Sequence, residues 1–407
     1  MAPKELDRLA TLLQTFDHEK GIALFDELAK DPANAGPILQ ELLLTAANHD
    51  DPALHTPHGP LTLHAARELL LLTRPPGGLG LLRFLVLYNF SLTKRTLSVA
   101  QAEANARAIP PGDPADMALA YRKAVMGGLG GQAAALLCRI ALDRGLERAL
   151  HLAVRTSLDD LGRLGHNLAA AAAHSEAASA LRIPRGLVPL ANLGHAQAAA
   201  LRSVPAVTIP EISAAPAEEP DVVRLGEFVD AWEFEHVERV LQALAAEGQA
   251  DVAYRPLLVA ASADPGFLGH TLSLAHAARE ATRYLTPSEN AWLLWKLYRT
   301  LTTHFGYPEF LRLGAATDID PGAIRNALDS SLRHKSPPAE ATVRQALEAG
   351  TPVEDVLAQV VDFYGNWTVG EKEHTISYLN AALQTAKFLG REEALLPLAI
   401  ALSKLPF

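Results

Sequence analysis

A short segment of this chain occurs twice. Residues 58–68 read HGPLTLHAARE, and residues 270–280 read HTLSLAHAARE. The second segment begins 212 positions after the first (270 − 58) and keeps the same pattern of a histidine, five residues, another histidine and then Ala-Ala-Arg-Glu. A match of this length with this internal spacing is seldom accidental, and long-period self-similarity is typical of repeated structural units. The sequence therefore predicts an internal duplication.

The composition predicts helices. Apolar residues make up 49% of the chain, and alanine and leucine, which favour helices most, dominate among them. Apolar residues recur at helical spacing in stretches such as Leu6–Phe16 and Ile22–Leu28, and no stretch alternates cleanly enough to predict a strand. We predict an all-α protein, a large helical body built from two pseudo-repeat halves and four quarter units.

The two halves have predicted boundaries. The first half covers residues 1–202 and the second covers residues 221–407. Residues 203–220 between them are rich in proline and lack a long apolar period, which is typical of a linker or a surface crossover. We expect the two halves to pack as one globular body.

Charge and cysteine content exclude several classes of protein. The net charge of -10 argues against a nucleic-acid partner, because binding phosphates needs a basic surface. No apolar run reaches membrane-spanning length and the first residues are too charged for a secretory signal, so we expect a cytoplasmic protein without a membrane partner. The single cysteine, Cys138, rules out an internal disulfide and a cysteine-rich metal site, and its apolar neighbours predict a packing role. The oligomeric state stays open.

Four histidines recur at a nearly constant interval, each near the start of a predicted helix. They are His58, His166, His270 and His374, with separations of 108, 104 and 104 positions (166 − 58, 270 − 166, 374 − 270). Equivalent side chains of units related by an internal rotation point toward a common axis. Neutral imidazole is a good ligand for iron, zinc, copper or nickel, and without thiolates the site would not be the usual structural zinc. We therefore predict these four histidines as metal ligands.

One other interpretation of these four histidines stays open at this point. Histidines at helix starts can fill surface or packing roles in a solenoid of helical repeats that binds no metal. The second histidine of each repeated segment, His64 or His276, lies six residues beyond the first. Six residues correspond to a rotation of ~240° around a helix, so His64 and His276 are predicted to lie on a different face from the ligands. There they would fill the core or contact and orient the ligand side chains.

The segments around the four histidines carry a family resemblance. The first is HGP at 58–60 followed by AAR at 65–67, and the second is LGH at 164–166. The third is HTLS at 270–273, with AAR at 277–279 and a tryptophan helix at 292–295. The fourth is EHTI at 373–376. Together these short segments span nearly the whole chain and resemble the questin oxidase-like family.

The resemblance implies an all-helical oxygenase that opens a ring of a polycyclic aromatic substrate by a Baeyer–Villiger-type step. It implies a non-haem iron held by several histidines, with a carboxylated lysine completing the coordination sphere in some members. The sequence leaves open whether a reductant such as NADPH is needed. This chain departs from the pattern after His374, where Ser377 and Tyr378 stand in place of a lysine and Lys372 precedes the histidine.

Three hypotheses follow from the sequence. The leading one is a metal-dependent oxygenase, an enzyme that acts on an aromatic small molecule with iron at His58, His166, His270 and His374. The second is a non-catalytic helical-repeat scaffold or ligand-binding protein, because a duplicated helical unit carries no chemistry by itself. The third is a hydrolase with zinc at the same histidines, which only metal analysis separates from the first.

Overall fold

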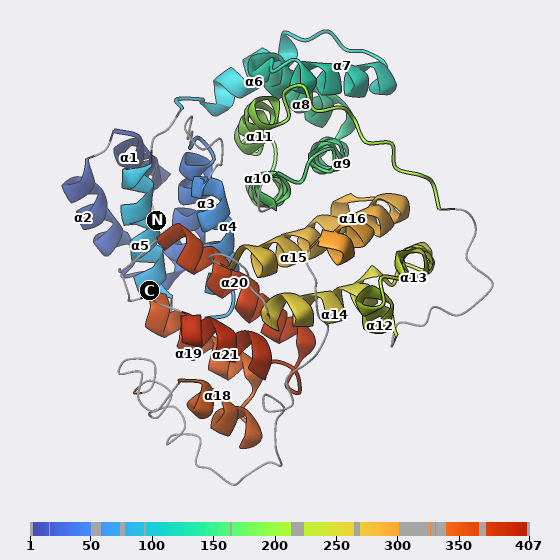
Figure 1. Ribbon diagram of the computed structural model, residues 1–407. Coiled ribbons are helices and arrows are strands. Elements are labelled where there is room, and N and C mark those ends of the chain that lie inside the picture. The colour runs from blue at the N-terminus through green and yellow to red at the C-terminus, as the bar shows by residue number, and fades with distance from the viewer. Residues whose placement is uncertain are drawn as a thin grey trace. The chain divides into compact units, whose positions relative to one another are not determined.

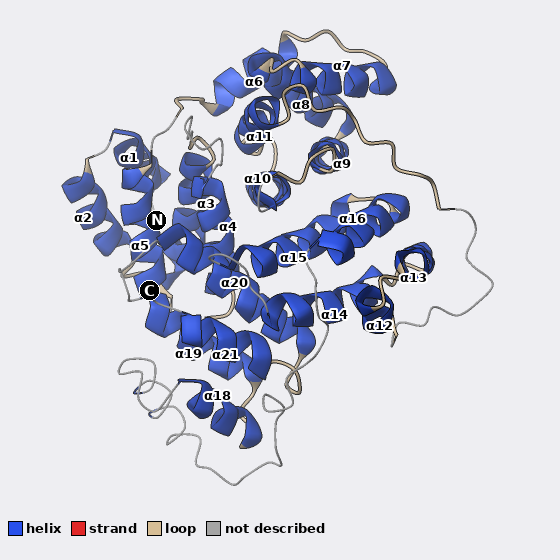
Figure 2. Cartoon of the chain, in the orientation of Figure 1, coloured by secondary structure: helices blue, strands red, loops and turns tan. Residues whose placement is uncertain are grey.

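Helices are the regular secondary structure of this chain wherever its structure is described, and loops connect them. A computed structural model describes residues 3–15, 17–49, 58–73, 78–92, 95–162, 165–212, 224–263, 269–300, 326, 330, 339–365 and 372–404. Within these ranges the secondary structure is helical and no β-strand occurs (Figure 2), so the all-α prediction is confirmed. None of the helices in these ranges has both the length and the apolar character needed to cross a membrane.

The chain divides into two compact units. One consists of Met1–Leu71 with Pro75–Val207, and the other of Leu72–Arg74 with Thr208–Phe407. The main division therefore falls inside the predicted linker, of which residues 213–220 lie outside the described part. Packing of the predicted halves as one body stays a prediction.

The first unit contains the helices from α1 to α11 (Figure 1). Their bounds are α1 Pro3–Thr15, α2 His18–Leu28, the 3₁₀ turn η1 Pro32–Asn34, α3 Ala35–Ala46, α4 His58–Leu70, α5 Leu79–Ser91, α6 Val99–Arg107, α7 Pro114–Met126, α8 Gly130–Arg144, α9 Leu146–Ser157, α10 His166–Leu181 and α11 Leu187–Ala200.

The second unit contains the helices from α12 to α21. Their bounds are α12 Leu225–Asp230, α13 Phe234–Ala246, α14 Ala250–Ala263, α15 His270–Ala281, the 3₁₀ turn η4 Thr282–Tyr284, α16 Pro287–Thr300, α18 Ala339–Glu348, α19 Val353–Gly365, α20 Lys372–Leu389 and α21 Leu395–Lys404.

Several helices begin where the sequence supplies a capping side chain. At the start of α6 the Ser98 hydroxyl accepts the Gln101 backbone N–H at 3.2 Å, and the Gln101 side chain accepts the Ser98 backbone N–H at 3.0 Å. This capping box satisfies two backbone donors that the helix itself leaves unpaired. At the start of α7 the Asp113 carboxylate accepts the Ala115 N–H at 2.8 Å, and Pro114 occupies the first turn, where no N–H is needed.

Small residues let α8 and α11 approach closely in the core of the first unit. Gly194 of α11 faces the backbone of α8, and a Cβ placed on it would lie 2.8 Å from the Cα and the N of Ala134. Cys138 of α8 is 1% exposed and its thiol contacts the Leu187 carbonyl at 3.3 Å, which agrees with its predicted packing role. The alanine-rich composition thus supports helix-on-helix packing at short distance.

The end of the first unit is anchored by a partly buried ionic cluster. The Asp159 carboxylate accepts the Val207 backbone N–H at 2.9 Å and pairs with the guanidinium groups of Arg122 and Arg155, at 2.6 and 3.0 Å. Arg155 also donates to the Val207 carbonyl at 2.6 Å. Because both backbone polar groups of Val207 are bound, the first residues of the predicted linker belong firmly to this unit.

The two units contain corresponding helices with corresponding neighbours. In the first unit α4 packs against α10 and α3, and α10 packs against α11. In the second unit α15 packs against α20 and α14, and α20 packs against α21. The repeated segment forms α4 in one unit and α15 in the other. These correspondences support the internal duplication, which itself stays a prediction.

Replacing Gly194 by alanine is expected to lower the free energy of unfolding by about 1 to 3 kcal/mol, because the facing backbone of Ala134 cannot rotate away from a new methyl group. The matched control is Gly131→Ala on α8, where nothing lies within 4 Å of the new Cβ. That variant should keep or slightly raise the stability, because alanine favours helix over glycine. Chemical denaturation measures both, and equal stabilities would contradict the close approach of α8 and α11.

Candidate functional site

The predicted ligand histidines lie in the first turns of four helices. His58 begins α4, His166 begins α10 and His270 begins α15, while His374 is the third residue of α20. His270 is buried, with 8% of its surface exposed, and the other three are partly buried. The structure therefore places all four side chains at helix N-termini, as the sequence predicted.

In the first unit His58 and His166 are brought together. Their ring centroids lie 6.1 Å apart and the ring planes are inclined by 72°. A third histidine, His49, supports the start of α4 because its Nδ1 accepts the Gly59 backbone N–H at 3.0 Å. A Cβ on Gly59 would lie 2.7 Å from the Cβ of His49, so the glycine after His58 is needed for this close contact.

In the second unit His270 and His374 are brought together. Their ring centroids lie 5.2 Å apart and the planes are inclined by 55°. Gly269, directly before His270, has a φ of 77°, and a Cβ on it would lie 2.2 Å from the ring of Tyr378. Tyr378 follows His374 by one helical turn on α20 and so fixes the first turn of α15 against α20. Tyr378 is therefore a packing contact of the glycine that precedes His270.

Both pairs fit shared coordination of one ion. Two imidazoles that bind an ion through nitrogens at about 2.1 Å have ring centroids roughly 4.6 to 6.5 Å apart, depending on the angle at the ion. The separations of 6.1 and 5.2 Å fall in this range. The ring separations alone therefore allow each pair to share an ion. The prediction that all four histidines share one centre concerns both units together and stays a prediction.

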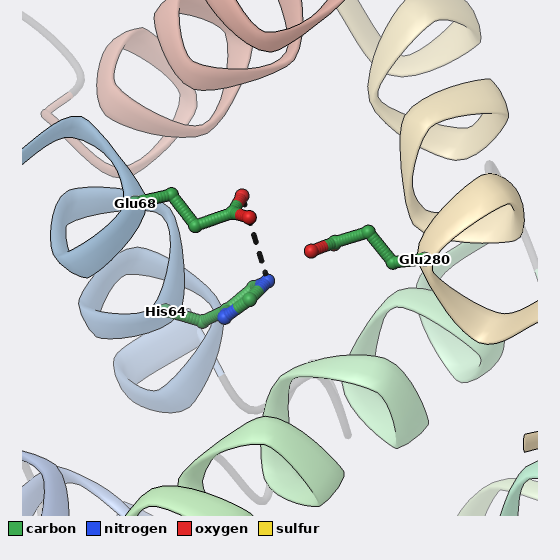
Figure 3. Close-up of side chains that lie close together, drawn as sticks. All are labelled: His64, Glu68 and Glu280. Atoms are coloured by element: carbon green, nitrogen blue, oxygen red, sulfur yellow. Dashed lines mark ion pairs between the residues drawn. The ribbon is translucent and has the colours of Figure 1, made fainter. Parts of the chain in front are cut away.

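The second histidine of each repeated segment is paired with a glutamate one turn further along the helix. On α4, His64 Nε2 lies 3.8 Å from Glu68 Oε2, and Figure 3 shows the two side chains pointing toward one another. On α15, His276 Nε2 lies 3.6 Å from Glu280 Oε2. Glu280, which Figure 3 also labels, belongs to the second unit. Each pair offers an imidazole nitrogen and a carboxylate oxygen, and both are donor types found in metal sites.

The core of the first unit also holds a titratable histidine. His174 lies about two turns after His166 on α10, is 1% exposed, and its Nδ1–H donates to the Ala170 carbonyl at 2.8 Å. Burial lowers its pKa from 6.5 to about 4, with the Ala170 hydrogen bond opposing the shift and His49 adding to it. Burial likewise raises the pKa of the Cys138 thiol to about 12, so this thiol is a poor nucleophile.

Glu68, Glu280 and Tyr378 were not predicted as parts of these clusters. The signal for the two glutamates was present, since each stands four residues after a histidine in a segment predicted to be helical. The contact between Tyr378 and Gly269 has no local signal, because it joins helices that are distant in the sequence.

Comparison with known proteins adds no relative. No protein-family model matches the chain, and neither a curated protein nor a solved structure matches it. The resemblance to the questin oxidase-like family therefore rests on the short segments around the histidines.

Replacing Gly269 by alanine is expected to destabilise the second unit more than the same change at Gly390. Both glycines have a left-handed backbone, with φ of 77° and 79°, which costs an alanine about 1 to 2 kcal/mol. Only at Gly269 does the new Cβ also overlap the Tyr378 ring, whereas nothing lies within 4 Å at Gly390. Denaturation midpoints of the two variants measure the difference. The excess should shrink in a Tyr378→Ala background, and an unchanged excess would contradict this contact.

Stability should fall as the pH falls from about 6.5 to 4 because of His174. In the unfolded chain this histidine takes up a proton below pH 6.5, while burial keeps it neutral in the fold down to about pH 4. The unfolded state then binds more protons, so the fold loses stability, by up to about 3 kcal/mol at the low end of the window. His174→Leu should flatten this part of the pH profile of the unfolding free energy, and His236→Leu at an exposed position is the control. Identical slopes for wild type and His174→Leu would contradict the assignment.

Proposed function

We propose that this protein is a metal-dependent oxygenase that binds non-haem iron through its helix-start histidines and acts on an aromatic or polycyclic small molecule, opening a ring by oxidation, in the cytoplasm. The observation that carries the proposal is the pairing of predicted ligands within each unit, His58 with His166 and His270 with His374. The likeness of the surrounding segments to the questin oxidase-like family supports the reaction class, and NADPH is a candidate reductant for it.

Iron binding accounts for this set of donor atoms better than a structural role of the histidines does. Imidazole nitrogens without thiolates are typical ligands of catalytic transition metals, which keep positions open for substrate and oxygen. Iron bound at these residues would activate dioxygen for insertion into the ring system. The partly buried imidazoles would hold the ion at fixed distances from the helix starts, and the contact of Tyr378 with Gly269 keeps the first turn of α15 in place beneath His270.

Metal analysis of the purified chain tests the proposal. Freshly prepared protein is expected to contain about one iron per chain, since the sequence predicts four histidine ligands for one ion. Replacing His58 or His270 by alanine should lower the iron content, since each substitution removes a ligand from one pair. Elemental analysis by mass spectrometry, with circular dichroism as the check on folding, measures the outcome.

The matched control is His236→Ala on α13, which removes an exposed imidazole whose Nδ1 pairs with Glu233 at 3.2 Å. Its iron content should equal that of the wild type. Folded wild-type protein without bound metal would overturn the proposal in favour of a helical scaffold. Stoichiometric zinc in place of iron would overturn the oxygenase in favour of a hydrolase at the same histidines.

A further inference from the structure

Trp232 is a large apolar residue that the fold leaves in solvent. It stands just after α12 in the second unit, is 80% exposed, and has a left-handed backbone with a φ of 62°. The Trp232 N–H donates to the Val229 carbonyl at 3.0 Å, and the Glu233 N–H donates to the Phe228 carbonyl at 2.8 Å. These two bonds form the Schellman ending of a helix, whose left-handed residue is most often glycine.

Elsewhere the chain places glycine at this position of the same motif. Gly128 after α7, Gly248 after α13 and Gly350 after α18 have φ of 70°, 72° and 85°, and each ending is closed by the same two hydrogen bonds. A left-handed backbone strains a residue that has a Cβ but not glycine, and an exposed indole gains nothing from burial. Because neither property of Trp232 favours folding, the exposed ring indicates a role in binding.

The aromatic rings next to Trp232 each carry a cation. Trp232 meets the Phe234 ring edge-on, with ring centroids 5.9 Å apart and planes inclined by 86°. The Arg299 guanidinium of α16 lies 5.2 Å from the centre of the Phe234 ring, and that of Arg224 lies 4.9 Å from the centre of the Phe228 ring. Within the described part of the chain no cation lies over the Trp232 ring itself, although an indole face attracts cations more strongly than a phenyl face.

The charges beside Trp232 are negative. The side chain of Glu233 is 48% exposed, and its Oε2 lies 3.2 Å from His236 Nδ1. Glu235 is exposed in the first turn of α13 and forms no ion pair with the described residues. These carboxylates attract a cationic group and repel the phosphates of nucleic acids and anionic lipids. Acidic residues also stabilise the N-terminus of a helix, but this effect does not account for the tryptophan beside them.

We propose that Trp232, Glu233 and Glu235 bind a lysine or arginine side chain from a basic segment of a partner protein. The cation stacks on the open face of the indole, and the carboxylates accept its charge-assisted hydrogen bonds. The hydrogen bonds of the Schellman ending hold the backbone of Trp232 in place before the partner arrives, which lowers the entropy cost of binding. The net charge of -10 favours the approach of a basic partner.

Binding of a fluorescently labelled oligoarginine peptide to the full chain, followed by fluorescence anisotropy, tests this surface. Trp232→Gly removes the indole and keeps every charge, so the affinity should fall about 2- to 30-fold with the loss of one cation–π contact. This variant should fold and unfold at a higher denaturant concentration than the wild type, because glycine relieves the left-handed strain. The matched control is Leu119→Ala on α7, which removes another exposed apolar side chain and should bind as the wild type does.

A second pair of variants separates this surface from general attraction to an acidic protein. Glu235→Gln should weaken peptide binding, whereas Glu147→Gln, which removes the same charge from the first turn of α9, should not. Loss of affinity in Trp232→Gly and Glu235→Gln, with both controls unchanged, supports the proposal. An absence of peptide binding, an affinity that Trp232→Gly leaves unchanged, or equal losses in Glu235→Gln and Glu147→Gln would overturn it. Trp232-dependent binding to phosphatidylserine vesicles without peptide binding would overturn it in favour of a membrane surface.

Discussion

The candidate site depends on the packing of two helices by their first turns. In each unit a helix that begins at a histidine, α4 or α15, lies against a second helix with a histidine in its first turn, α10 or α20. The side chains in the first turns of both helices therefore meet, and in the second unit this requires a glycine with a left-handed backbone where the Tyr378 ring fills the space of a Cβ. A Cβ at this position would push the helices apart and separate the imidazoles.

The sequence was sufficient to predict much of this arrangement. The repeated segment and the regular histidine spacing located the starts of α4, α10 and α15 at His58, His166 and His270, because glycine or proline beside each histidine marks a helix boundary. Which histidine would contact which could not be read from the spacing. Intervals of 108 and 104 residues indicate that the four histidine positions are equivalent. Which two histidines contact one another depends on which helices pack together.

Glu68 and Glu280 could not be predicted from the sequence for a different reason. Glu68 and Glu280 stand at the helical spacing that brings a glutamate beside a histidine, but such pairs are common on exposed helix faces and contribute little there. Burial distinguishes the pairs of this protein from such exposed pairs, and burial is decided by helices elsewhere in the chain. The same holds for His174, whose lowered pKa follows from complete enclosure in the first unit rather than from any neighbour in the sequence. A shared centre for all four helix-start histidines stays a prediction for the same reason.

The central claim is that the paired imidazoles bind a metal ion directly. X-ray absorption spectroscopy at the iron edge of the iron-loaded chain tests it most directly, because the scattering of imidazole rings is distinct from that of single oxygen atoms. We predict a shell of nitrogen neighbours at about 2.1 Å with the outer-shell pattern of at least two imidazoles. The imidazole contribution should be smaller in His270→Ala. A first shell made only of oxygen, with no imidazole pattern, would contradict it.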